Sequence, residues 1–285
     1  MEIAVTAGFS HLSPIDYIAG AAERIEAAGF AALWVPEHVL FFPDYASIYP
    51  YSPDGKVPGD PDGVLDPFAA LTFIAAHTTT LRLGTGICLV PQRQPVYTAK
   101  MVADLDYLSQ GRVDFGIGVG WLEEEFNALG KDFGQRSKRC DEYIGAMKAL
   151  WGPDPVSFAG ETVTINNAQF NPKPVQAPHP PIFVGGESNA ALRRVAALAD
   201  GWYGFGVAPE DLPARLERLD EHLAAAGRTR SEIKIYVSPN QLAVDPDIAA
   251  AYAAGGVDQL IMPLFANRLD SLERRIERVS AAVAM

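Results

Sequence analysis

The sequence predicts an α/β fold: a (β/α)8 TIM barrel with an insertion near residues 152–180 and a long loop after the second strand. Short apolar runs alternate with longer segments whose apolar residues recur at helical spacing. This unit occurs eight times in 285 residues, and parallel strands need such helical crossovers. A doubly wound open sheet is the alternative. Because no division into two halves is visible, we expect one barrel domain over residues 1–285.

The individual elements follow from apolar spacing and from capping residues. Ile3–Ala7 is a short apolar strand, and the apolar stripe of Ile15–Ala28 ends at Gly29, a C-cap glycine. Ala32–Val35 is the second strand, and Asp66 is expected to cap the next helix. The other strands are predicted at Leu81–Ile87, Val113–Ile117, Pro181–Val184, Trp202–Phe205, Ile233–Val237 and Gln259–Met262. The other helices are predicted at Pro67–Ala76, Val96–Leu108, Arg136–Leu150, Asn189–Ala199, Leu212–Ala225, Pro246–Ala253 and Leu269–Val283.

Two segments interrupt this alternation. Phe42–Leu65 is rich in Pro, Gly and Tyr and follows the second strand, on the side where barrel active sites lie. Its aromatic residues favour a substrate lid over a plain solvent loop. Gly152–Pro180 links a helix back to a strand on the other face of the barrel. We expect a small hairpin there, with a structural role or an oligomer contact.

Composition and charge exclude several classes of protein. The 35 acidic residues outnumber the 23 Lys and Arg, and the net charge of −12 argues against nucleic acid, whose phosphate backbone needs a basic face. No apolar stretch approaches the ~20 residues that span a bilayer, and no secretion signal is visible. Cys88 and Cys140 are expected to be free thiols in a reducing cytoplasm. One small anion remains compatible with this charge, because local dipoles can hold a single phosphate.

A glycine pair is a candidate anion site. The apolar run at residues 182–184 leads directly into Gly185-Gly186, and a helix pattern starts at once. Free N–H groups and the positive end of the helix dipole would meet a ligand there, and Ser188 would add a donor or cap the helix. A phosphate cradle and a tight turn that only needs glycine both fit this pattern.

Glu37 and His38 mark the exit of the second strand toward the mouth of the barrel. An imidazole can donate or accept a proton near neutral pH, and Glu37 could orient it or bond to a cofactor ring. A lone histidine is more often structural, but its place before the expected lid favours a role in catalysis.

Two strands carry glycines in place of larger side chains. In Leu83–Cys88 the glycines flank Thr85 and would let a flat ring lie against the strand. In Gly116–Trp121 the end of strand four, with Gly118 and Gly120, could admit a ring or a phosphate, although it is no dinucleotide fingerprint.

Other chemistries find less support. The five histidines lack metal-binding spacing, and no G-x-S-x-G elbow is present, so no metal site is expected. Glu123-Glu124-Glu125 are either acid–base carboxylates or, as the helix dipole favours, acidic residues that open a helix.

Several stretches resemble the luciferase-like monooxygenase superfamily. They are the AK…DLDYLSQGRV run at 99–113, GVGWLEEEF at 118–126, KPVQAP at 173–178 and GGES…RRVAALADGW at 185–202. The similarity keeps the family's order over about two thirds of the chain. The family fold is a (β/α)8 barrel, and members use either flavin mononucleotide (FMN) with oxygen or the deazaflavin coenzyme F420. This sequence is most similar to the F420 branch.

The resemblance implies roles for particular residues. It places a non-prolyl cis peptide behind the ring at Gly86-Ile87 and the phosphate-bearing tail at 185–188, with Arg193 and Arg194 offsetting the acidity. His38 matches the acid–base histidine of the sugar-phosphate dehydrogenases of this branch. Those enzymes place a glutamate where this chain has Trp121, which argues against a dehydrogenase of the sugar-phosphate type. The Tyr- and Phe-rich mouth favours a flatter, more apolar substrate. The expected cofactor-binding residues are Glu37, Thr85, Gly86, Ile87, Gly118, Gly120, Gly185, Gly186, Glu187 and Ser188.

The expected function is therefore that of an F420-dependent oxidoreductase. A hydride moves between the deazaflavin ring and a small organic substrate, and His38 donates or accepts the proton. An FMN-dependent two-component monooxygenase, a non-catalytic cofactor-binding barrel and a metal-dependent hydrolase are the alternatives. Expected partners are a small-molecule substrate and a separate cofactor-reducing enzyme in the cytoplasm, without nucleic acid or membrane, and a homodimer is left open.

Overall fold

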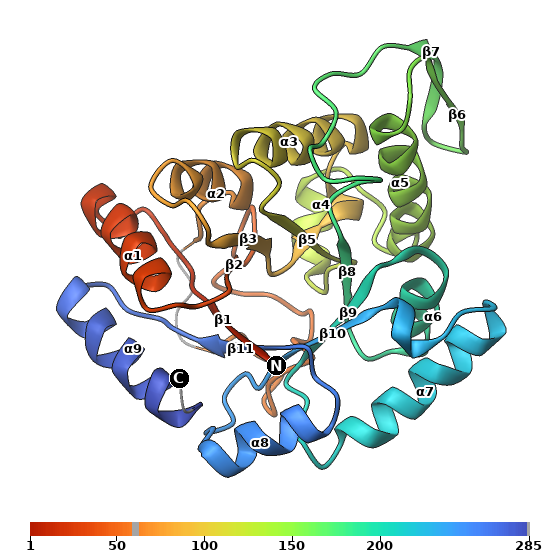
Figure 1. Ribbon diagram of the computed structural model, residues 1–285. Helices are drawn as coiled ribbons and strands as arrows, with labels where there is room; N and C mark the ends of the chain where they lie inside the picture. Colours follow the sequence, from red (N-terminus) through yellow and green to blue (C-terminus); the bar gives the residue numbers. More distant parts are fainter. Residues whose placement is uncertain (59–62, 284–285) are drawn as a thin grey trace.

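The strands form a closed parallel barrel in the computed structural model, which describes residues 1–58 and 63–283 (Figure 1). The barrel strands are β1 (Glu2–Thr6), β2 (Ala32–Val35), β3 (Arg82–Thr85) with β4 (Cys88–Leu89), β5 (Val113–Gly118), β8 (Ile182–Gly185), β9 (Gly201–Phe205), β10 (Lys234–Ser238) and β11 (Gln259–Pro263). Pairing of β3 with β5 closes the ring. The predicted (β/α)8 barrel is confirmed, and the open sheet is wrong.

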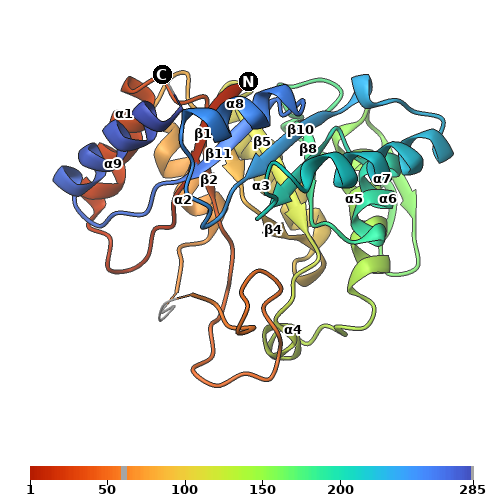
Figure 2. The ribbon, with the colours of Figure 1, turned by 90° about the horizontal axis from the view of Figure 1, so that it is seen from below.

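Helices cover the outside of the barrel (Figure 1). They are α1 (Ile15–Ala27), α2 (Pro67–Ala75), α3 (Pro95–Leu108), α5 (Arg136–Trp151), α6 (Asn189–Leu198), α7 (Leu212–Ala225), α8 (Pro246–Ala254) and α9 (Leu269–Ala282), with short 3-10 turns η1 (Val90–Gln92) and η2 (Arg230–Glu232). The short helix α4 (Glu123–Ala128) lies instead with the loops at one end of the barrel (Figure 2). Asp66 caps α2 as predicted, because its carboxylate accepts hydrogen bonds from the N–H groups of Phe68 and Ala69. Apolar periodicity therefore located these helices well.

The third strand differs from the sequence prediction. Leu81–Ile87 was expected as one strand, but β3 ends at Thr85 and β4 begins at Cys88. The Gly86–Ile87 peptide between them is cis, at the position that the family resemblance implied. β3 pairs with both β2 and β5, whereas β4 pairs with β5 alone. The Gly86 N–H still donates to Val35 O of β2 at 2.7 Å, and beyond this point the chain pairs with β5 alone.

An aromatic cluster fills the interior of the barrel. The Trp34 ring lies 5.2 Å from the Tyr203 ring and 5.8 Å from the Phe183 ring, centroid to centroid, and its Nε1 donates to Gln259 Oε1 at 2.9 Å. A Cβ on Gly84 would lie only 2.3 Å from the Trp34 ring. The glycines of this strand, Gly84 and Gly86, were expected to admit the flat ring of a ligand. The space beside Gly84 is filled by the indole of Trp34 instead.

The loops that follow the strands gather at one end of the barrel. Figure 2 shows the segment after β2 and helix α4 at the end opposite to both chain termini. Residues 59–62 of the expected lid lie outside the described residues. The expected hairpin is present as β6 (Val156–Ala159) and β7 (Thr164–Ala168), antiparallel and packed beside α5. Within the described ranges, no helix is long and apolar enough to cross a bilayer.

Candidate active site

A cavity of about 1320 Å³ opens at the end of the barrel where the strands finish, the usual place for active sites in this architecture. Ten residues that the sequence singled out line it: Glu37, His38, Gly86, Ile87, Gly118, Gly120, Gly185, Gly186, Glu187 and Ser188. Thr85 was expected with them, but it is fully buried and its hydroxyl donates to Gly116 O at 2.6 Å. Its side chain therefore serves the sheet rather than the cavity.

His38 is held by a carboxylate that sequence reasoning assigned to a helix terminus. His38 Nδ1 lies 3.1 Å from Glu125 Oε2, and the Glu125 side chain is 0% exposed. The sequence analysis favoured the view that residues 123–125 merely open a helix. They do open α4, but the third of them faces inward. The next residue, Phe126, is fully buried. An apolar residue at this position is a local sequence signal that this part of the helix packs inward.

Glu125 collects hydrogen bonds from the chain around His38. Its Oε1 accepts from the N–H groups of Val39 (2.6 Å) and Leu40 (3.1 Å), and its Oε2 accepts from Gln92 Nε2 (2.8 Å). Burial alone would raise the pKa of Glu125. The hydrogen bonds and the proximity of His38 outweigh burial and hold that pKa below its usual value, so the carboxylate is ionised.

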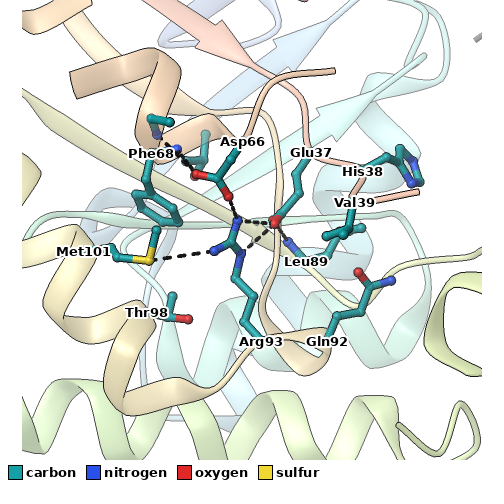
Figure 3. Close-up of polar contacts among 12 residues, drawn as sticks. Glu37, His38, Val39, Asp66, Phe68, Leu89, Gln92, Arg93, Thr98 and Met101 are labelled. Atoms are coloured by element: carbon teal, nitrogen blue, oxygen red, sulfur yellow. Dashed lines mark hydrogen bonds and ion pairs between the residues drawn. The ribbon is translucent and has the colours of Figure 1, made fainter. Parts of the chain in front are cut away.

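Glu37 points the other way, into a buried ion-pair network (Figure 3). Its carboxylate accepts from Leu89 N–H at 2.6 Å and from Arg93 Nε at 2.5 Å, and Arg93 also pairs with Asp66. Glu37 therefore braces β2 against β4 and α2. The suggestion that it orients His38 is wrong, because Glu125 occupies that place, and its contact with a cofactor stays a prediction.

Ile87 forms the floor of the cavity. A Cβ on Gly118 would lie 2.1 Å from Ile87 Cδ1, so the bare strand end makes room for this side chain, and direct contact of Gly118 with a ligand stays a prediction. Ile87 and Gly118 both line the cavity. An apolar side chain backed by glycine offers a flat surface suited to one face of a ring.

The start of α6 has the features of an anion site. Gly186 adopts φ +108°, a conformation that disfavours other residues, and Ser188 Oγ caps the helix by accepting from Ala191 N–H at 3.2 Å. The Glu187 carboxylate turns aside to accept from Phe205 N–H at 2.9 Å, and burial raises its pKa. The glycine pair therefore presents backbone rather than an acidic side chain to the cavity.

The Arg side chain that lines the cavity is not one that the sequence predicted. Arg194, expected to offset the acidity, is buried and bonded to Asp141 and Ser137, and the exposed Arg193 is not among the residues that line the cavity. Arg136, at the start of α5, lines the cavity instead.

Arg136 retains an unused donor. Its guanidinium carbon lies 3.7 Å from the centroid of the Phe133 ring, and Nη1 donates to Phe133 O at 2.9 Å. Its Nε is buried and has no hydrogen-bond partner among the described residues. Burial lowers the pKa of Arg136, opposed by the charge of Glu123. A buried cationic donor without an acceptor is a suitable receptor for a ligand anion.

An arc of aromatic rings covers the mouth of the cavity. Successive ring centroids lie between 4.6 and 5.8 Å apart, mostly edge to face. The arc consists of Phe41, His38, Trp121, Tyr49, Tyr51 and Phe205, all of which line the cavity. The segment at 42–58 is fastened by Glu124, which accepts from Ala46 N–H (2.6 Å) and from Ser47 Oγ (2.6 Å). This part of the expected lid therefore does cover the site.

Comparison with known proteins places these features in a family. A family model described as "Luciferase-like monooxygenase" matches residues 2–282. An uncharacterized protein of Mycobacterium tuberculosis is 33% identical over 276 residues, 93% of each chain. An FMNH2-dependent dimethylsulfone monooxygenase of Pseudomonas putida is 33% identical over 156 residues, which are 54% of this chain and 42% of that protein.

Solved structures share the fold at lower identity. The monooxygenase RslO1 from Streptomyces bottropensis aligns with a TM-score of 0.77 and 21% identity, over 100% of this chain and 99% of that one. An F420-dependent secondary alcohol dehydrogenase, in complex with an F420–acetone adduct, aligns with a TM-score of 0.75 and 16% identity, over 99% and 98%. At these identities the likeness concerns the fold alone.

Proposed function

This chain belongs to the luciferase-like monooxygenase family, and we propose that it is a coenzyme F420-dependent oxidoreductase acting on a flat, largely apolar organic substrate. The observation that carries the proposal is that one cavity combines an apolar floor, an anion cradle and a carboxylate-held imidazole. Family membership supports a flavin-type cofactor. We infer the deazaflavin, rather than FMN, from the resemblance of the motifs.

The residues present fit a tricyclic ring with a phosphorylated tail. Ile87 would support one face of the ring, and Gly185, Gly186 and Ser188 would hold the phosphate with Arg136 as the counter-ion. When bound, the deazaflavin would supply or accept the hydride, and the protein's part is binding, orientation and proton management.

His38 is the group suited to handle the proton. It is the one imidazole that lines the cavity among the described residues, and Glu125 holds its Nδ1. A substrate carbonyl that is reduced gains a proton on oxygen, and an alcohol that is oxidised loses one. The remaining ring nitrogen, Nε2, can exchange that proton with the substrate oxygen.

The aromatic arc supports the substrate class. Five of its six rings are Phe, Tyr or Trp side chains that line the cavity, and the sixth is the imidazole of His38. Burial raises the pKa of Tyr49 to about 12, so its hydroxyl remains a neutral donor. Two of the acidic side chains that line the cavity, Glu37 and Glu187, already accept hydrogen bonds from backbone N–H groups. These surroundings favour a neutral planar molecule over a sugar phosphate.

An FMN-dependent two-component monooxygenase is the second candidate. The partial match to an FMNH2-dependent dimethylsulfone monooxygenase favours it, because that protein's name states its cofactor. The same floor and cradle would suit flavin mononucleotide. Such an enzyme would need a separate reductase as partner, as the proposed F420 enzyme would need a supply of reduced cofactor.

Cofactor titration separates the candidates. Purified protein is titrated with F420 and with FMN, reduced and oxidised, and the ring fluorescence is followed. The proposal predicts micromolar or tighter binding of F420 and weaker binding of FMN. Micromolar binding of FMN with none of F420 would establish the second candidate in its place.

A His38→Ala variant distinguishes an enzyme from a cofactor-binding barrel. The variant should bind the cofactor as the wild type does and lose turnover by about 10²–10⁴-fold, the usual contribution of a general acid or base. The measurement uses a panel of planar ketones, enones and alcohols. If wild-type protein binds cofactor but converts nothing in the panel, the non-catalytic barrel gains support.

A further inference from the structure

We propose that Glu125 is a positioning residue that fixes the tautomer of His38, with the proton on Nδ1 and with Nε2 free for the substrate. The role of His38 in this statement rests on the proposed function. The tautomer itself rests only on contacts within the protein, so it can be measured without cofactor or substrate.

The carboxylate leaves His38 no choice of tautomer. An ionised carboxylate only accepts hydrogen bonds, so a nitrogen 3.1 Å away must carry the proton. The other groups that contact the Glu125 carboxylate are two backbone N–H groups and the Gln92 amide, and each of them also donates a hydrogen bond to it. In the neutral ring the lone pair is then on Nε2, for which no hydrogen bond to a described residue is recorded.

Charge balance adds a second effect. Glu37 and Glu125 are both buried, but Glu37 is neutralised by Arg93. The recorded ion pairs give Glu125 no Lys or Arg partner among the described residues, and His38 is its only basic contact. His38 is therefore the basic partner of Glu125, as Arg93 is the basic partner of Glu37.

Nε2 of His38 is not engaged by the other titratable side chains that line the cavity. The rings of Phe41 and Trp121 are the recorded aromatic neighbours of the imidazole, at 4.6 and 5.8 Å. The remaining titratable side chains that line the cavity are Glu37, Glu123, Glu187, Arg136, Tyr49, Tyr51 and Tyr203. No hydrogen bond or ion pair is recorded between these and His38 within the described chain.

Glu125 also supports the start of the lid, so a test must separate the two roles. A glutamine at this position can still accept from Val39 and Leu40 N–H with its carbonyl oxygen. Its amide group then faces His38 Nδ1 as a donor, which forces the proton to Nε2. Gln92 can rotate to offer its Oε1, which is buried and without a partner, so the variant has a route to a satisfied network.

The experiment is nitrogen NMR of histidine-labelled protein without cofactor. Wild-type His38 should show the Nδ1–H tautomer, and Glu125→Gln should switch it to Nε2–H. Glu124→Gln is the matched control: it removes the neighbouring carboxylate, which holds the lid through Ala46 and Ser47, and it should leave the tautomer unchanged. In turnover, Glu125→Gln should lower kcat by ~100-fold or more with cofactor affinity nearly unchanged.

The outcomes decide the matter separately from the proposed function. An Nε2–H tautomer in the wild type, or an unchanged tautomer in Glu125→Gln, would overturn the inference. If the variant fails to fold, the tautomer measured in the wild-type protein still tests the inference. If the tautomer is as expected but neither cofactor binds, the inference about Glu125 holds and the proposed function fails.

Discussion

Two glutamates at the mouth of the barrel show that the partner, not the residue type, decides what a buried carboxylate does. Glu37 is paired with Arg93 and braces the framework. Glu125 is paired with His38 and faces the cavity through it. Both side chains are almost completely excluded from solvent. Glu37 is therefore expected to act on stability, and Glu125 on the chemistry that we propose for His38.

Replacement of Arg93 tests the bracing role of Glu37. Arg93→Met leaves Glu37 buried and unpaired, and we expect a loss of about 3–5 kcal/mol in the free energy of unfolding. Urea denaturation measures it. Arg24→Met is the control, because the Arg24–Glu273 pair is exposed and should be worth only about 0–1 kcal/mol. Equal effects of the two substitutions would contradict the role given to Glu37.

Replacement of Arg136 tests the anion cradle. Arg136→Ala should weaken binding of the phosphate-bearing cofactor by about 10- to 100-fold. This corresponds to the loss of about 1.5–3 kcal/mol, the usual contribution of a hydrogen bond to a charged group. It should leave binding of the same ring without its phosphate unchanged. Arg193→Ala removes an equal charge from an exposed position on α6, and it is the control. Equal losses for both ligands, or for both variants, would exclude a direct contact between Arg136 and the phosphate.

At the scale of elements, periodicity and capping residues predicted the strands and helices, but not the break in the third strand. An apolar run is typical of one continuous strand. The family resemblance placed a cis peptide at Gly86-Ile87, but it did not predict that the pairing partner changes there. In the same way, the local sequence does not distinguish among three consecutive glutamates at the start of a helix. Which of them faces His38 depends on how α4 packs on the barrel, and that is a tertiary property.

Charged site residues show the same limit. Arg193 and Arg194 follow the glycine pair in sequence, but the helical turn sends Arg194 toward Asp141. Arg136 reaches the cavity from another helix, about 50 residues earlier in the chain. Backbone features such as the cradle glycines could be predicted from local sequence. The side-chain partners that complete the site come from distant elements and could not.

The turn before β3 should make stability depend on pH. Burial would raise the pKa of Glu26 on α1, but hydrogen bonds from the N–H groups of Thr79, Thr80 and Leu81 outweigh it and lower that pKa to about 2. A carboxylate with a depressed pKa contributes stability that is complete above its unfolded value near 4.5 and is lost toward pH 2. Because the group is partly exposed, we expect about 1 kcal/mol.

Comparison of Glu26→Gln with wild type measures this contribution. Urea unfolding at pH 6 and at pH 3 should show a smaller acid destabilisation in the variant. Glu23→Gln on the same helix is the control, since its contact is an exposed pair with His77. An identical pH dependence for wild type and Glu26→Gln would contradict the argument.

At the scale of the whole molecule, the proposed function requires an acidic barrel to hold an anionic ligand through local dipoles and one cation. The net charge of −12 repels an anionic cofactor at long range, while Arg136 and the start of α6 attract it at contact. We therefore expect the association rate to rise several-fold between about 10 and 150 mM salt, as the repulsion is screened. Stopped-flow fluorescence measures it, and a rate that falls with salt would contradict this balance.

The most direct test of the central claim is a crystal structure of the protein with bound deazaflavin. The account predicts that the ring lies on Ile87, that the phosphate contacts Gly185-Gly186 and Arg136, and that a substrate analogue is held with its oxygen about 3 Å from His38 Nε2. A ring bound outside this cavity, or an imidazole that faces away from it, would contradict the account even though the barrel itself is correct.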